Sequence, residues 1–104
     1  MTEPRIALEP RHFEQLIGII RRSMSNAHGA VLLFGSRARG NPRPASDIDL
    51  AVSVKGSSAG VLSSLRENLE NSLIPFTVDV VDLDSCDPVL AGEVQREGVV
   101  LWNG

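Results

Sequence analysis

Two segments with the pattern of β-strands stand close together in this chain, and the short stretch between them limits the fold. Residues 30–34 are continuously apolar, as in a buried strand, and residues 47–54 are β-branched and partly alternating. Residues 37–46 are rich in Arg, Gly and Pro, which predicts a loop with at most one helical turn. Because such a connection is too short for a full crossover helix, we expect the two strands to be antiparallel.

Apolar residues recur at helical spacing in two longer segments. The first runs from Pro10, a favoured first residue of a helix, to about residue 26, and Gly29 is expected to stop it in a left-handed conformation. The second covers residues 58–73, with an apolar stripe that continues to Leu73 and is expected to lie in the core.

The last third of the chain is predicted to add a strand, a helix and a short end. Residues 76–81 form the strand, and Asp87 is expected to cap a helix whose apolar residues, beginning with Val89, face inward and which Gly98 ends. Residues 99–102 are a final strand or a packed tail. Because the second helix crosses between strands, it should make the third strand parallel to a neighbour. The expected fold class is α/β (α+β), a small mixed sheet flanked by helices.

Length and composition favour one small globular domain. The 104 residues are 42% apolar and 22% charged, and we expect a single domain over 1–104 with its core at about 30–102. The net charge of -3 argues against strong nucleic-acid binding. A single cysteine cannot form an internal disulfide, and no apolar segment approaches the ~20 residues that span a bilayer. We therefore expect a cytoplasmic protein with no membrane partner.

Asp47 and Asp49 are the first candidates for chemistry. Side chains two positions apart in a strand share a face, so these carboxylates should project together while Ile48 lies on the opposite face. Such a pair repels unless a proton, a hydrogen bond or a cation compensates it, and hard oxygen ligands suit magnesium. The alternative is that Asp47 caps a turn and Asp49 is simply exposed. Against it stands the placement of Asp at the start of a strand, where it is disfavoured.

The other candidates lie on either side of this pair. Asp79 stands between two valines in the third strand, and its alternative role is a salt bridge to an arginine. Gly35 lets the backbone approach a ligand, and the hydroxyl of Ser36 with adjacent amides can hold phosphate oxygens. Arg37 and Arg39 can pair with phosphates through two hydrogen bonds each. The alternative for these four is an ordinary solvated loop.

Together these residues resemble the signature of the DNA polymerase β-like nucleotidyltransferase superfamily. The signature consists of Gly35-Ser36, ten intervening residues, Asp47-Ile48-Asp49 and a later lone Asp79 in a strand. The string from Phe34 to Gly40, the string Ser46 to Leu50 and the closing segment 97–101 are similar to its minimal branch, which includes MntA-type antitoxins of HEPN/MNT toxin–antitoxin pairs. The resemblance covers about residues 30–102.

The resemblance implies the palm core of that superfamily and its chemistry. Asp47 and Asp49 would bind two Mg²⁺ ions, with Asp79 joining them at the catalytic ion. Gly35 and Ser36, with Arg37, Arg39 and Ser46, would bind the nucleotide. An acceptor hydroxyl would attack the α-phosphate of a nucleoside triphosphate, with ATP as the donor, and release pyrophosphate.

The resemblance also implies a partner, since minimal members are commonly encoded beside a helical HEPN protein. The transferase would act as antitoxin by attaching AMP to a tyrosine of that partner. Two alternatives stay open at this point: a non-catalytic nucleotide-binding module that neutralises the partner by contact alone, and a transferase acting on a small molecule such as an aminoglycoside. The apolar face of the first helix also leaves a homo-oligomer open.

Overall fold

The computed structural model describes residues 6–40, 47–56 and 59–104. In chain order its elements are α1 (Pro10–Ser23), β1 (Gly29–Phe34), α2 (Ser36–Arg39), β2 (Ile48–Val54), α3 (Ala59–Glu70), β3 (Val78–Asp82), α4 (Pro88–Glu97) and β4 (Val99–Asn103). Within these ranges no helix is both long and apolar enough to cross a membrane.

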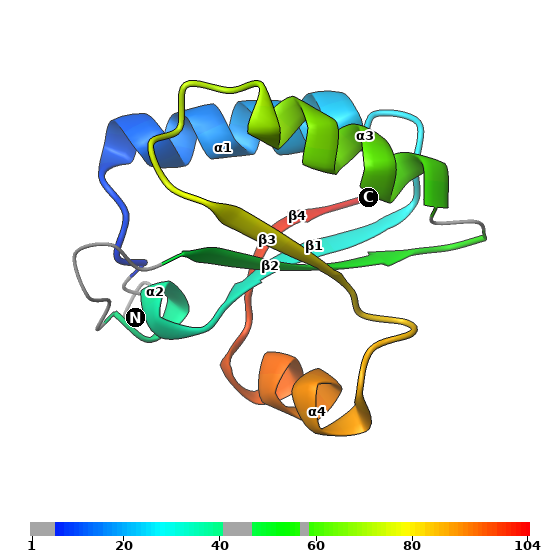
Figure 1. Ribbon diagram of the computed structural model, residues 1–104. Coiled ribbons are helices and arrows are strands. Elements are labelled where there is room, and N and C mark those ends of the chain that lie inside the picture. The colour runs from blue at the N-terminus through cyan, green and yellow to red at the C-terminus, as the bar shows by residue number, and fades with distance from the viewer. Residues whose placement is uncertain (1–5, 41–46, 57–58) are drawn as a thin grey trace.

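The strands form a mixed sheet in the order β3-β2-β1-β4 (Figure 1). β1 pairs with β2 in antiparallel fashion, which confirms the prediction from the short loop, and β4 also pairs with β1 in antiparallel fashion. β2 and β3 are parallel, because α3 returns the chain to the same end of the sheet. The predicted mixed α/β fold is therefore confirmed.

Helices cover the two faces of the sheet unequally. α1 and α3 lie together on one side, whereas α4 lies alone on the other and α2 lies at one end (Figure 1). The larger core joins α1 and α3 to alternate residues of β2, namely Ile48, Leu50 and Val52. A smaller cluster of Phe34, Ala51 and Val94 joins α4 to the opposite face. Alternation in β2 thus assigns Asp49 and Ala51 to the face that α4 only partly covers.

Two predicted apolar contacts are wrong. Leu73 is 88% exposed, because α3 ends at Glu70 and the side chain lies beyond the last turn that packs on the sheet. Val89 is 78% exposed, because it lies in the first turn of α4, whereas Val94 is buried. In the same helix the predicted N-cap is confirmed, since Asp87 accepts a hydrogen bond from the Val89 N–H.

The predicted role of Gly29 is also wrong. α1 already ends at Ser23, and Gly29 is the first residue of β1 rather than a left-handed helix stop. A glycine is needed there for a different reason, because a Cβ would collide with the backbone carbonyl oxygen of Ser53 in β2. The absence of a side chain lets the two central strands begin their pairing.

Candidate active site

The register of the parallel strands places two carboxylates side by side. Asp49 in β2 is the partner of Asp79 in β3, and both lie two residues before apolar residues of the cluster under α4. Side chains two apart share a face, so both carboxylates are on the α4 side of the sheet, beyond the area that α4 covers. Asp47 immediately precedes β2 and is exposed.

Nearby charges and partial burial both act on the Asp49 carboxyl group. Its pKa is raised from 3.8, first because partial burial disfavours the charged form, and then because Asp79, Asp47 and Glu93 place negative charge near it. Arg39 acts in the opposite direction. The candidate carboxylates therefore converge on Asp49, and a cation in this position would relieve their repulsion.

Gly35 is fitted against this carboxylate. Its φ is 78°, in the left-handed region that glycine adopts without cost, and it connects β1 to α2. A Cβ on Gly35 would collide with the Asp49 Oδ2, so the absence of a side chain is what admits the carboxylate. Ser36 follows directly as the first residue of α2.

The two predicted phosphate-binding arginines point in different directions. Arg37 is only 5% exposed, its Nη1 donates to the Ala7 carbonyl at 2.8 Å, and its guanidinium stacks 4.2 Å above the Phe76 ring. Its placement therefore supports packing of the N-terminal segment. Arg39 instead extends from α2 toward α4, where it forms ion pairs with Glu93 and Glu97. It is also close enough to Asp49 to affect the pKa of that carboxyl group. Ser46, the remaining predicted nucleotide-binding residue, lies outside the described residues.

The alternative role for Asp79 has no support in the part of the chain that the structure describes. The ion pairs found there involve Arg11 and Arg39, and neither pairs with Asp79. Asp79 is exposed on the open face of the sheet. It is therefore accessible to a ligand.

The donor set fits magnesium that arrives together with a nucleotide. Among the described residues, no three His, Cys, Asp or Glu side chains are close enough to hold a metal ion by themselves. Magnesium, however, is usually bound by one or two carboxylates together with water and substrate phosphates. Asp49 and Asp79, as neighbours on one face, supply that number of hard oxygen ligands, and Asp47 lies at the same end of β2.

Sequence reasoning missed Glu93 and Glu97. Both lie on α4, four residues apart and hence on one face of the helix. Glu97 Oε2 is 2.9 Å from Arg39 Nη1, and Glu93 Oε1 is 3.7 Å from the same atom. The i,i+4 spacing was visible in the sequence, but nothing there indicated that this helix would face α2.

Comparison with models of protein families shows to which family this chain belongs. The family model described as polymerase beta, nucleotidyltransferase matches residues 14–104, nearly the whole chain. The chain belongs to this family. No curated protein sequence matches this nucleotidyltransferase closely enough to count as a relative.

Solved structures similar to this nucleotidyltransferase include several toxin–antitoxin pairs. A toxin–antitoxin structure with AMP-PNP has a TM-score of 0.70 and 30% identity, with 88% of this chain and 73% of that chain covered. The MntA–HepT pair has a TM-score of 0.58 and 25% identity, with 92% and 74% covered. The tri-AMPylated Shewanella oneidensis HEPN toxin in complex with its MNT antitoxin has a TM-score of 0.60 and 25% identity, with 93% and 74% covered.

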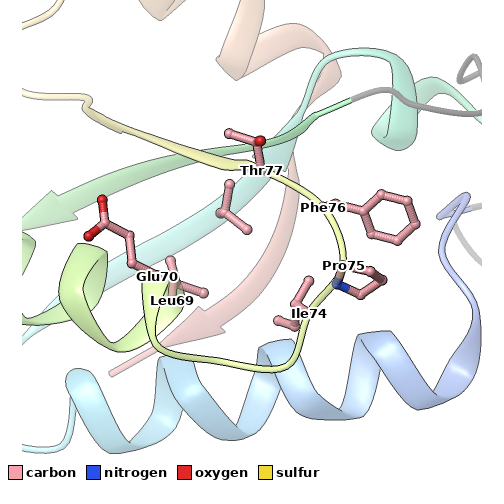
Figure 2. A pocket seen from close by; sticks show the side chains of 7 residues that line it. Leu69, Glu70, Ile74, Pro75, Phe76 and Thr77 are labelled. Atoms are coloured by element: carbon pink, nitrogen blue, oxygen red, sulfur yellow. The ribbon is translucent and has the colours of Figure 1, made fainter.

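One pocket of this nucleotidyltransferase lies away from the carboxylates. It has a volume of about 420 Å³ and is formed by the end of α3 and the segment leading into β3 (Figure 2). Leu69 and Glu70 line it from α3, and Phe76 and Thr77 line it from the segment before the strand. None of the three aspartates contributes to its lining. The candidate site is thus an open surface of the sheet and not this pocket.

Proposed function

We propose that this domain is a magnesium-dependent nucleotidyltransferase that moves AMP from ATP to a hydroxyl group of a protein partner. The observation that supports it most is the convergence of Asp47, Asp79 and a half-buried Asp49 beside Gly35, on a face of the sheet that its helices leave open. Clustered carboxylates destabilise a small domain, which favours a functional reason for their retention.

The roles we propose follow from the position of each residue. Asp47 and Asp49, joined by Asp79, hold two magnesium ions. Gly35 and Ser36 receive the phosphates, where the chain turns from β1 into α2. Bound magnesium would neutralise charge on the phosphates and lower the pKa of the acceptor hydroxyl.

The carboxylate of Asp79 suits the role of proton acceptor. It is exposed on the open face beside Asp49, so it can reach a hydroxyl that approaches the α-phosphate from solvent. In our proposal the hydroxyl oxygen forms a bond to the α-phosphorus, the bond to the bridging oxygen breaks and pyrophosphate leaves. The hydroxyl proton passes to a carboxylate oxygen of Asp79.

The proposed acceptor is a tyrosine hydroxyl of a HEPN-type partner. This is supported by the similar structures, which include an AMPylated HEPN toxin bound to an MNT antitoxin and a toxin–antitoxin structure with AMP-PNP. It also fits a site that is open rather than enclosed, because a protein side chain can approach an exposed face of a sheet without an acceptor pocket.

Label transfer from ATP tests the proposal. The protein is incubated with magnesium, ATP labelled at the α-phosphate and the product of the gene beside its own, and Asp47→Asn is compared with wild type. We expect the partner to be labelled by wild type and not by Asp47→Asn. Asp87→Asn is the matched control, since asparagine also caps a helix, and it should label the partner normally.

Two other results would contradict this function. A partner that forms a stable complex with both variants and is labelled by neither would indicate a module that acts by contact alone. Label on an added aminoglycoside, and none on the protein, would indicate a small-molecule transferase.

A further inference from the structure

An ion-pair cluster joins the two helices that flank the candidate site. Arg39 Nη1 on α2 contacts Glu97 Oε2 at 2.9 Å and Glu93 Oε1 at 3.7 Å, both on α4. The three side chains are between 35% and 42% exposed, which makes them less solvated than the surface pair of Arg11 and Glu9, at 77% and 63%. Reduced exposure weakens screening, so this cluster can hold a geometry that a surface pair cannot.

The position of the cluster gives it a consequence for the site. Arg39 is close enough to Asp49 to interact with it, and so is Glu93. The guanidinium thus contacts the glutamates on α4 and also attracts the Asp49 carboxylate on the sheet. Arginine has a long, flexible stem, so without the glutamates it would be drawn to Asp49 and compete there with any metal ion.

The guanidinium also keeps hydrogen-bonding capacity. It has five N–H donors in a planar fork, and the contacts found among the described residues use those on Nη1. A fork held on one side by carboxylates can offer its other donors to a phosphate in a fixed orientation. Fixing the side chain in advance reduces the entropy lost when the nucleotide binds.

We propose that Glu97, with Glu93, is a positioning residue for nucleotide binding, which holds the Arg39 guanidinium away from Asp49 and presents it to the phosphates of the bound nucleotide. The inference rests on the proposed function. It assigns a role to two residues outside the Gly-Ser and Asp-x-Asp motif.

The test is the affinity for AMP-PNP with magnesium, measured by calorimetry on the intact domain. An ion pair that is partly exposed contributes up to ~1 kcal/mol. If that energy supports nucleotide binding, its loss in Glu97→Gln should raise the Kd for AMP-PNP roughly fivefold. Glu93→Gln should act in the same direction but less, since its contact is longer. Glu9→Gln, which breaks the remote surface pair, is the matched control and should leave the Kd unchanged.

A double mutant separates positioning from a general structural effect. If Glu97 acts through Arg39, Glu97→Gln should add nothing to the Kd of Arg39→Gln. In transfer assays Glu97→Gln should raise the KM for ATP more than it lowers kcat. Glu97→Asp, which keeps the charge, should recover part of the affinity.

The outcomes distinguish this inference from the function on which it rests. A Glu97→Gln variant that binds as tightly as Glu9→Gln, or whose effect adds to that of Arg39→Gln, overturns the positioning role. The calorimetric comparison needs no acceptor, so normal nucleotide binding without any transfer would contradict the proposed function and still decide the role of Glu97. A wild-type domain that binds no AMP-PNP would overturn both.

Discussion

Gly35 lies between the last residue of β1 and the first residue of α2, with its backbone in the left-handed region and the Asp49 carboxylate against its Cα. We expect Gly35→Ala to lower the stability of the domain by at least the ~1–2 kcal/mol that a left-handed backbone costs other residues. It should also reduce transfer sharply, because the new methyl displaces Asp49. Urea denaturation and the label-transfer rate measure the two effects.

Gly56 provides the control for this variant. It also has a positive φ, of 84°, but a Cβ there would meet nothing within 4 Å. Gly56→Ala should therefore show the backbone cost and keep its activity. Equal losses of activity in the two variants would mean that contact with Asp49 is not what makes Gly35 necessary.

Gly35→Ala is expected to lower both stability and activity, whereas a change of Asp49 should raise stability and abolish activity. Its pKa is raised in the folded state, so the folded protein binds more protons than the unfolded chain between pH 3.8 and that raised pKa. The cost of the charged group is absent below 3.8, grows as the pH rises and is complete above the raised pKa. Asp49→Asn should therefore raise the Tm at pH 7 without magnesium while abolishing transfer.

A pH series checks this sign. The gain in Tm from Asp49→Asn should shrink as the pH falls from 7 toward 3.8, the ordinary value for this carboxyl group. A variant less stable than wild type at pH 7 would show that the Asp49 carboxylate makes net favourable contacts without any metal ion.

The face of the sheet on which Asp49 and Asp79 lie was predictable from sequence for a local reason. In a strand the face of a residue follows from counting by two, and the apolar neighbours of Asp49 and Asp79 show which face is buried. Which strand pairs with which is not local, yet here the short loop and the crossover helix left few choices. The pairing of Asp49 with Asp79 then followed from the register, which only the structure supplies.

At the level of elements, the short helix α2 separates two arginines that look equivalent in the sequence. Positions i and i+2 of a helix do not share a face, so a four-residue helix directs Arg37 inward and Arg39 outward. The sequence predicts a loop here, and the directions of the two arginine side chains could not be predicted from it. They depend on the residue at which the helical turn begins. Glu93 and Glu97 were missed for the same reason, since α4 approaches α2 only in the folded chain.

This separation predicts different consequences for the two arginines. Arg37→Gln should destabilise the domain by about 1–3 kcal/mol, because it removes a charged hydrogen bond to Ala7 and the stacking on Phe76. Nucleotide affinity of the folded fraction should change little. Arg39→Gln should lower the affinity with a small effect on stability. Thermal denaturation and calorimetry on the same samples compare the two variants. If Arg37→Gln raised the Kd and Arg39→Gln did not, Arg37 and not Arg39 would be the phosphate ligand.

At the level of the whole molecule, the two faces of the sheet have different tasks. The side covered by α1 and α3 contains most of the core, and the side with α4 combines a small cluster with the site. Leu65, fully buried in the larger core, should cost about 2–5 kcal/mol when changed to Ala and leave nucleotide affinity unaltered. Val94→Ala should cost less stability but weaken affinity, because it loosens the helix that holds Glu93 and Glu97.

Denaturation followed by calorimetry on the folded fraction distinguishes these two variants. If Leu65→Ala weakened nucleotide binding as much as Val94→Ala, the site would depend on overall stability and not on the seating of α4. The burial of Val94 and the exposure of Val89 in one helix show why this division could not be foreseen. Both are valines in one short helix, but Val89 lies in its first turn and is exposed, whereas Val94 lies further along and packs on the sheet.

The order of the strands has a consequence for how rigid the site is. β2 lies between two hydrogen-bonded neighbours, whereas β3 pairs only with β2 among the described strands. The strand that carries Asp49 is therefore hydrogen-bonded on both sides, whereas the strand that carries Asp79 is hydrogen-bonded on one side only. We expect amide hydrogens of β3 to exchange with solvent deuterium faster than those of β2 and to slow when magnesium and nucleotide bind. A carboxylate with this freedom can adjust its distance to incoming phosphates while its partner serves as the fixed reference.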